Sequence, residues 1–297
     1  MVSEPEELRP RRARSKGMRS RKKRVFTFLM GSVLLLALLA ATACATGQEA
    51  PPQTSTSVGQ ATASPPQLTS GGQGGAALYQ VVTFTTSDGV VLSGRLFGSG
   101  DAGIILAHMY PADQTSWQSA AQTLAGEGYL VLTFDFRGYG ESEGKKDIQY
   151  LDRDVLAAIN ALAQAGATRT VLMGASMGGT ASLVAAEQVL SQQASGEQTG
   201  SPTPEICGVI TLSAPVEFKG LSAAEAVPRL ACALLFLAAE KDVGAESAKE
   251  LARLAQGRSQ LYIFPGSEHG TNLLQGPQAE QIWQIIGNFL DDHLPVR

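Results

Sequence analysis

Met173-Gly174-Ala175-Ser176-Met177-Gly178-Gly179 is the stretch of sequence that decides the fold. It follows a short apolar run at residues 170–173 and precedes an alanine-rich segment at residues 180–190, which is typical of a helix. A Gly-x-Ser-x-Gly turn between a strand and a helix exposes the serine hydroxyl, and its glycines leave room where one chain segment passes another. The stretch therefore predicts that Ser176 is a nucleophile, and that the Met177 N–H at the start of the helix faces an acyl oxygen.

Strand and helix signals alternate along the rest of the chain. A hairpin is predicted first, from residues 79–85 and 90–97 around a Ser-Asp-Gly turn. Such alternation favours a mostly parallel sheet with helices on both faces, and ligands then bind at the carboxyl ends of the strands. Further strands are predicted at residues 103–107, 129–134, 169–173, 206–212, 232–237 and 260–264, and helices at 115–125, 148–164, 223–227, 245–255 and 278–293.

An acid and a base follow two of the later predicted strands. Asp242 comes after the strand at residues 232–237, and His269 lies on a glycine-flanked loop after the last strand. With Ser176 they give the chain order Ser, Asp, His, which is expected for a hydrolase of this topology. Glu217, after the preceding strand, is a rival for the acid. Of the other two histidines, His108 follows an earlier strand and His293 ends the final helix.

Four sequence elements together carry a resemblance to a known family. From about residue 79 to the C-terminus, the chain resembles the α/β-hydrolase superfamily, nearest its small members with little cap, which are related to dienelactone hydrolases and to serine esterases or peptidases. The resemblance implies a mostly parallel, eight-stranded sheet with helices on both faces and a minimal lid. The four elements are His-x-x-Pro at residues 108–111, Phe-Asp-x-Arg-Gly-x-Gly-x-Ser at 134–142, the Gly-x-Ser-x-Gly turn, and Gly-Ser-Glu-His-Gly at 266–270.

The resemblance implies a role for each candidate residue. Ser176 is the expected nucleophile, His269 the base that takes its proton, and Asp242 the acid that orients the histidine. The oxyanion donors are expected to be the backbone N–H groups of Met177 and Tyr110. The donor on the Tyr110 loop is assigned from the family, in which it lies two residues after the histidine.

The loops beside the predicted site contain one departure from the family and several structural residues. Met109 stands where the family usually has glycine after the histidine, and its N–H is an alternative oxyanion donor. His108 is expected to hydrogen-bond the backbone and shape this loop. Asp135, Arg137 and Ser142 are interpreted as structural residues that hold a loop beside the pocket.

The segment that often forms a lid is short here, at residues 213–230. An open site permits short-chain esters, small lactones or peptide-like substrates. A serine at the turn, in place of aspartate, argues against a dehalogenase or an epoxide hydrolase, whose covalent esters form on a carboxylate. The predicted function is hydrolysis of carboxylic esters; a serine peptidase and a non-catalytic binding protein of the same fold stay open. No cofactor is expected, and three scattered histidines argue against a catalytic metal.

The N-terminal part predicts targeting to a membrane. Ten Lys and Arg precede an uncharged apolar run at residues 25–43, and Ala41-Thr42-Ala43-Cys44 resembles a bacterial lipoprotein signal. Lipidation of Cys44, an uncleaved anchor and plain secretion are the alternatives, and each places the domain outside the cytoplasm. Residues 45–77 are predicted to be a disordered tether, and 78–297 the folded domain. After Cys44, thirteen Lys and Arg face twenty-four Asp and Glu, which disfavours nucleic acid as a partner.

Two more cysteines begin apolar runs, Cys207 and Cys232. If those runs are adjacent parallel strands, the two cysteines lie at matching ends. An oxidising location then permits a disulfide, and the alternative is a pair of buried free thiols.

Overall fold

The computed structural model describes residues 67–69, 79–196, 203–255 and 259–296. The basic segment, the apolar run and Cys44 lie outside the described residues, as does most of the predicted tether. Within the described ranges, no helix is long and apolar enough to cross a membrane. Everything described below belongs to one compact unit.

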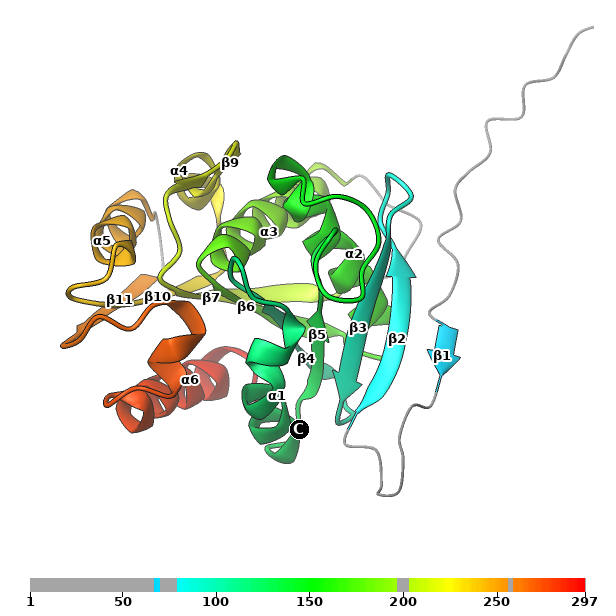
Figure 1. The fold of residues 1–297 in the computed structure, drawn as a ribbon, viewed down its shortest axis with the longest axis horizontal. Coiled ribbons are helices and arrows are strands. Elements are labelled where there is room, and N and C mark those ends of the chain that lie inside the picture. Colours follow the sequence, from blue (N-terminus) through cyan, green and yellow to red (C-terminus); the bar gives the residue numbers. More distant parts are fainter. Residues whose placement is uncertain (1–66, 70–78, 197–202, 256–258, 297) are drawn as a thin grey trace, which may run out of the picture. The chain divides into compact units, whose positions relative to one another are not determined.

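In the described part of the chain, nine strands form one sheet (Figure 1). Parallel pairing runs from β5 through β4, β6, β7 and β10 to β11, and β1, β2 and β3 pair antiparallel at the other edge. In spatial order the strands are β1 (Gln67–Thr69), β2 (Gln80–Thr85), β3 (Val91–Phe97), β5 (Leu130–Phe134), β4 (Ala102–Ala107), β6 (Arg169–Ala175), β7 (Glu205–Leu212), β10 (Ala233–Ala239) and β11 (Ser259–Phe264).

Eight of these strands make the mostly parallel sheet that the sequence predicts, including the opening hairpin of β2 and β3. The short β1 is a difference, because it lies within the predicted tether and pairs with β2. The free edge of β2 presents unpaired N–H and C=O groups, which a passing extended segment can satisfy.

Helices cover both faces of the sheet (Figure 1). One face packs against α2 (Leu151–Gln164), α3 (Met177–Ser195) and α5 (Gly244–Leu254), and the other against α1 (Gln118–Gly126) and α6 (Ala279–His293). Because strand side chains alternate between faces, each face has its own hydrophobic cluster. With both faces covered, β4, β5 and β10 are buried along their whole length, which explains why their sequences are apolar without alternation.

The first helix starts differently from the prediction. A short 3-10 helix, η1 (Gln114–Trp117), precedes α1, and its cap is Asp113, whose carboxylate accepts a hydrogen bond from the Thr115 N–H. Residue 115, where the sequence predicts the helix to begin, lies inside this 3-10 helix.

The segment between β7 and β10 is as short as the sequence predicts. It contains a two-stranded hairpin, β8 (Glu217–Phe218) and β9 (Leu221–Ser222), and then α4 (Ala223–Ala226) and the 3-10 turn η3 (Val227–Arg229). The hairpin was not expected from the sequence.

Cys207 and Cys232 are both free thiols in the structure, which is the alternative to a disulfide that the sequence left open. Their placement at matching ends of adjacent parallel strands is confirmed by the pairing of Ala233 with Gly208. However, the register of β6 against β7 shifts beside Cys207, and this irregularity turns Cys207 toward the face covered by α1 and α6. Cys232 packs against the hydrophobic cluster on the opposite face. Burial raises the pKa of Cys232 to about 11.

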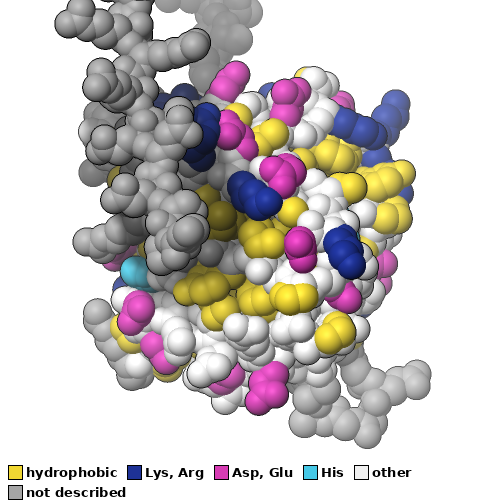
Figure 2. Space-filling view, turned by 90° about the vertical axis from the view of Figure 1, so that its left-hand side faces the viewer, with side chains coloured by type: hydrophobic (Ala, Val, Ile, Leu, Met, Phe, Trp, Pro, Cys, Tyr) yellow, Lys and Arg dark blue, Asp and Glu magenta, His cyan; other side chains and the backbone are white. Residues whose placement is uncertain are grey.

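The opposite edge of the sheet is the exposed strand β11. Leu261 and Tyr262 on this strand are about one-third exposed, and Val243 beside it is 87% exposed. On the face turned toward β11, hydrophobic side chains gather in the middle, with acidic and basic side chains around them (Figure 2).

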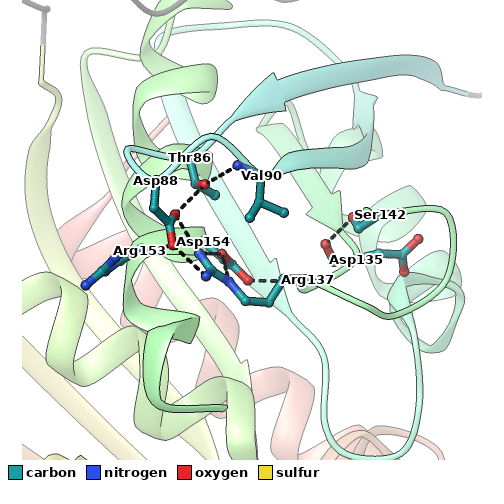
Figure 3. Close-up of polar contacts among 8 residues, drawn as sticks. All are labelled: Thr86, Asp88, Val90, Asp135, Arg137, Ser142, Arg153 and Asp154. Atoms are coloured by element: carbon teal, nitrogen blue, oxygen red, sulfur yellow. Dashed lines mark hydrogen bonds and ion pairs between the residues drawn. The ribbon is translucent and has the colours of Figure 1, made fainter. Parts of the chain in front are cut away.

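A partly buried ionic network joins the β2–β3 turn to the loop after β5 (Figure 3). The guanidinium of Arg137 is 2.8 Å from Asp88 and 2.7 Å from Asp154, which is fully buried in α2. The hydrogen bond from Arg137 holds the pKa of Asp88 well below its ordinary value, whereas burial raises the pKa of Asp154 to about 6. Arg137 is therefore structural, as predicted, and it fixes the start of the loop that runs beside the candidate site.

Candidate active site

Ser176 sits on a strained turn between β6 and α3. Its backbone has φ 47° and ψ −116°, a conformation that residues with a β-carbon rarely adopt. The Ser176 N–H donates to the Leu212 carbonyl of β7 at 2.8 Å, which fixes the turn to the sheet. The side chain makes no helix-capping hydrogen bond, so capping does not explain a serine here. Retained strain of this kind points to a functional constraint.

The glycines of the turn are required by close contacts. A β-carbon on Gly174 would lie 2.4 Å from the Gly178 carbonyl oxygen, and one on Gly178 would lie 2.3 Å from the Ala107 carbonyl oxygen. One on Gly179 would lie 2.8 Å from the Ala214 side chain. The turn therefore packs directly against the ends of β4 and β7, which brings the loop after β4 against the start of α3.

His269 and Asp242 form a hydrogen-bonded pair at the carboxyl ends of β11 and β10. The distance from His269 Nδ1 to Asp242 Oδ1 is 2.8 Å, and the Asp242 side chain is 3% exposed against 33% for His269. An ionised carboxylate only accepts hydrogen bonds, so Nδ1 carries the proton and Nε2 keeps a free lone pair. The rival acid, Glu217, lies on the exposed hairpin strand β8.

Ser213 connects the candidate residues and was not singled out in the sequence. It follows β7 with φ 59°, and its hydroxyl oxygen accepts a hydrogen bond from the Gly270 N–H at 3.2 Å. A β-carbon on Gly244 would lie 2.8 Å from the Ser213 Cα and 2.9 Å from Asp242 Oδ2. Ser213 thus holds the loop of His269 and packs beside the loop of Asp242. In the sequence, the one sign that Ser213 belongs to the site is its position directly after a predicted strand.

The hydroxyl of Ser176 hydrogen-bonds to no described residue, so the structure does not join it to His269. The neighbouring residues do meet, since a β-carbon on Gly270 would lie 3.4 Å from the Ala175 side chain. Catalytic hydrogen bonds are often long without substrate and shorten in the reacting complex. Ser176 is 9% exposed, and its hydroxyl would not have to break a hydrogen bond to another described residue before bonding to His269.

His108 shapes the start of the loop after β4, as the sequence predicts. Its Nε2 accepts from the Phe136 N–H at 3.1 Å, so Nδ1 bears the proton and donates to the Met109 carbonyl at 3.0 Å. The ring is fully buried, and this burial lowers the pKa of His108. His108 is thus a neutral structural histidine, with neither nitrogen free for proton transfer.

Asp135 fixes the other end of the same loop. Its carboxylate accepts from the backbone and side-chain nitrogens of Gln114, both at 2.8 Å, and from the Glu141 N–H at 3.0 Å. The Ser142 hydroxyl donates to the Asp135 carbonyl at 2.6 Å (Figure 3). The loop after β5 therefore clamps both ends of the loop that carries Tyr110, which confirms Asp135 and Ser142 as structural.

The two expected oxyanion donors are available. The N–H groups of Met177 and Tyr110 donate to no described residue, and Met177 is the first residue of the 19-residue helix α3. Helix N-termini favour negative charge. The departure from the family at Met109 is accommodated by Gly270: a β-carbon there would lie 2.5 Å from the Met109 sulfur. The Met109 sulfur also lies 3.9 Å from the Thr271 hydroxyl.

Comparisons with known proteins agree with this geometry. A family model described as the alpha/beta hydrolase fold matches residues 104–194, which run from β4 through the turn of Ser176 to the end of α3. An esterase of Pyrococcus furiosus superposes with a TM-score of 0.63 at 21% identity, covering 78% of this chain and 98% of the esterase. This chain has the α/β-hydrolase fold. The resemblance to the α/β-hydrolase superfamily predicted from the motifs is confirmed.

Two curated relatives match part of the α/β-hydrolase domain. Bifunctional epoxide hydrolase 2 of Sus scrofa is 34% identical over 84 residues, and epoxide hydrolase A of Mycobacterium tuberculosis is 38% identical over 85 residues. These matches cover 28% and 27% of this chain, and the chain spans only 15% and 26% of the length of the two relatives.

Among the described residues, no group of three His, Cys, Asp or Glu is placed to hold a metal.

Proposed function

We propose that this protein is a serine hydrolase that cleaves carboxylic esters through an acyl-enzyme. The observation that carries the proposal is the hydrogen bond between His269 and Asp242 beside a strained turn that presents Ser176. Nε2 of His269 takes the Ser176 proton as the oxygen attacks the ester carbonyl. Asp242 holds the ring in the required tautomer and stabilises the imidazolium.

The tetrahedral oxyanion is bound by the N–H groups of Met177 and Tyr110. His269 then gives its proton to the leaving alcohol, and the alcohol departs. Water, deprotonated by the same imidazole, releases the acyl group from Ser176. A serine at the turn favours this chemistry over that of the epoxide hydrolases named among the relatives, which would need a carboxylate nucleophile at this position.

A fluorophosphonate probe tests the proposal, because it phosphonylates a serine that a histidine activates. We expect labelling of the wild type and none of Ser176→Ala, with turnover of short 4-nitrophenyl esters lost by about 10⁴–10⁶-fold in the variant. Ser182→Ala is the matched control, since Ser182 is also buried but lies six residues further along, inside α3, where its hydroxyl bonds the Gly178 carbonyl. No labelling of the wild type would favour a non-catalytic binding protein. Equal turnover of esters and nitroanilides would favour a peptidase.

The proposal includes a location outside the cytoplasm, with the N-terminal segment holding the domain at the membrane. The support is the sequence pattern of basic residues, an apolar run and Cys44. Mass spectrometry of the native N-terminus tests it: a diacylglyceryl group on Cys44 indicates a lipoprotein, an intact N-terminus an anchor, and an unmodified cleaved end secretion. Recovery of an intact chain in the soluble cytoplasmic fraction would contradict all three.

A further inference from the structure

A chain of aromatic contacts leads outward from the candidate nucleophile. Tyr139 is buried, and its hydroxyl lies 3.9 Å from the sulfur of Met177, the residue after Ser176. The Tyr110 ring stands edge-on to the Tyr139 ring, with centroids 6.4 Å apart, and Tyr110 is 52% exposed. The two rings therefore connect the start of α3 with the surface at the loop that carries an expected oxyanion donor.

Two lysines from different segments lie over these rings. The Lys146 ammonium is 4.3 Å from the centroid of the Tyr139 ring, and the Lys219 ammonium is 5.7 Å from that of Tyr110. Lys219 is also 5.9 Å from the Phe218 ring, on the turn of the β8–β9 hairpin. Lys146 comes from the loop before α2.

The hairpin lies against that same region of the chain. A β-carbon on Gly220, next to Lys219, would lie 3.7 Å from the side chain of Gln149. The two lysines therefore reach the aromatic pair from two neighbouring segments that form one short rim. We name this rim, made of Tyr110, Tyr139, Lys146, Phe218 and Lys219, the lysine–tyrosine rim.

The lysine–tyrosine rim carries positive charge that the described residues do not neutralise. Neither Lys146 nor Lys219 pairs with a described carboxylate, whereas Lys249 on α5 pairs with Glu246 at 2.7 Å. A ring attracts an ammonium group without cancelling its charge. After Cys44 the chain carries an excess of eleven acidic residues, and Lys146 and Lys219 bring two ammonium groups without an ion pair together at one rim. Such a rim attracts anions and repels cations.

We propose that Lys146 and Lys219 bind a carboxylate on the substrate, so that the enzyme prefers esters with a free acid group at some distance from the bond that is cleaved. Monoesters of dicarboxylic acids are the simplest members of this class. This inference rests on the proposed ester hydrolysis. Lys146 and Lys219 act on specificity, and Tyr110 and Tyr139 hold the two ammonium groups beside the reacting centre.

Three esters with acyl chains of six carbons and terminal groups of different charge test the inference. They are 4-nitrophenyl hexanoate, the mono-4-nitrophenyl ester of adipic acid, and 4-nitrophenyl 6-(trimethylammonio)hexanoate. For the full-length protein at low ionic strength we expect kcat/KM to fall in the order anionic, neutral, cationic. Because exposed charges are screened within about 10 Å at 0.1 M salt, 0.5 M NaCl should bring the three values together.

Lysine variants assign the preference to the rim. Lys146→Gln and Lys219→Gln should each lower the adipate-to-hexanoate ratio of kcat/KM by about threefold, and the double variant by about tenfold, as two ammonium groups several ångströms from the charge predict. Lys145→Gln is the matched control, because it removes the same charge one residue away and contacts no ring. This control should leave the ratio unchanged.

Three results would overturn the inference, and they are distinguishable. A double variant that still reacts with fluorophosphonate but keeps the wild-type ratio would exclude the rim and leave ester hydrolysis intact. A wild type with no turnover of any of the three esters and no labelling at Ser176 would overturn both the inference and the proposed function. A ratio that falls equally in Lys145→Gln would assign the effect to net charge and also refute the rim.

Discussion

Replacing Ser176 by glycine should stabilise the protein while it abolishes the proposed activity. Ser176 has a positive φ of 47° with ψ −116°, a region that glycine occupies freely and residues with a β-carbon occupy only under strain. Its hydroxyl has no hydrogen-bond partner among the described residues, so the substitution removes no bond. Ser176→Ala removes the same hydroxyl but keeps the β-carbon and the strain. The pair of variants therefore separates the strain from the chemistry.

The magnitude follows from two opposing contributions. A residue held in such a region costs about 1–3 kcal/mol. Substitution by glycine relieves this strain, but it also costs about 0.5–1 kcal/mol of stability, because the unfolded chain gains conformational freedom. Ser176→Gly should therefore be about 1 kcal/mol more stable than Ser176→Ala. For a domain of this size, that difference raises the midpoint of thermal unfolding by about 2–4 °C.

Urea unfolding at 25 °C, followed by tryptophan fluorescence, measures the difference directly. The informative quantity is the shift of the midpoint at constant slope, since a changed slope would indicate a changed unfolded state. Both variants should be inactive toward esters and unlabelled by fluorophosphonate. If Ser176→Gly is no more stable than Ser176→Ala, the backbone of the turn is not strained, and the strain argument for a functional serine fails.

Two further predictions concern the acid and the ionic network. Asp242→Asn should lower kcat by about 10⁴-fold, because the amide favours the wrong histidine tautomer. Glu217→Gln should retain activity. If a steady-state assay finds the reverse, Glu217 is the acid and Asp242 is not. The lowered pKa of Asp88 means that its pairing with Arg137 stabilises the protein above the ordinary value of 3.8 and is lost as the pH falls below it. Asp88→Asn should thus be about 1–2 kcal/mol less stable at neutral pH and should lose less stability than the wild type between pH 4 and 2. Parallel urea curves for the two proteins across this range would show that Asp88 does not carry the effect.

The central strands and the order of the site residues could be predicted from the sequence. β4, β5 and β10 are short apolar runs bounded by turns, and a strand buried on both faces needs such a composition. Ser176 and His269 stood out because each follows such a strand on a loop rich in glycine. Local pattern sufficed there, since the parallel sheet brings all carboxyl ends of its strands to one edge.

Other features depend on contacts that no local pattern reports. The β8–β9 hairpin consists of two-residue strands, too short for any periodicity to be visible. The sequence could not decide between a disulfide and free thiols at Cys207, because a register irregularity turns this residue to the other face and nothing in the residues around it signals that shift. Ser213 holds the histidine loop through its positive φ and one hydrogen bond from a backbone N–H. The sequence shows that this serine follows a strand, but it does not show which residue the serine contacts.

The pairing of strands also explains why Asp242, and not Glu217, reaches His269. β10 and β11 are neighbours with Ala239 opposite Phe264, and their pairing continues past the sheet, because the Glu240 N–H donates to the Phe264 carbonyl at 2.8 Å and the Lys241 N–H to that of Gly266 at 2.9 Å. This extension brings the loops of Asp242 and His269 side by side.

The end of β7, by contrast, is occupied by Ser213, which turns the chain at φ 59° and uses its hydroxyl to hold Gly270. The chain then leaves for the exposed hairpin, which carries Glu217 away from the sheet edge. Ser213 thus holds the histidine loop from the end of β7, and the acid comes instead from the loop after β10, which lies beside the loop of His269.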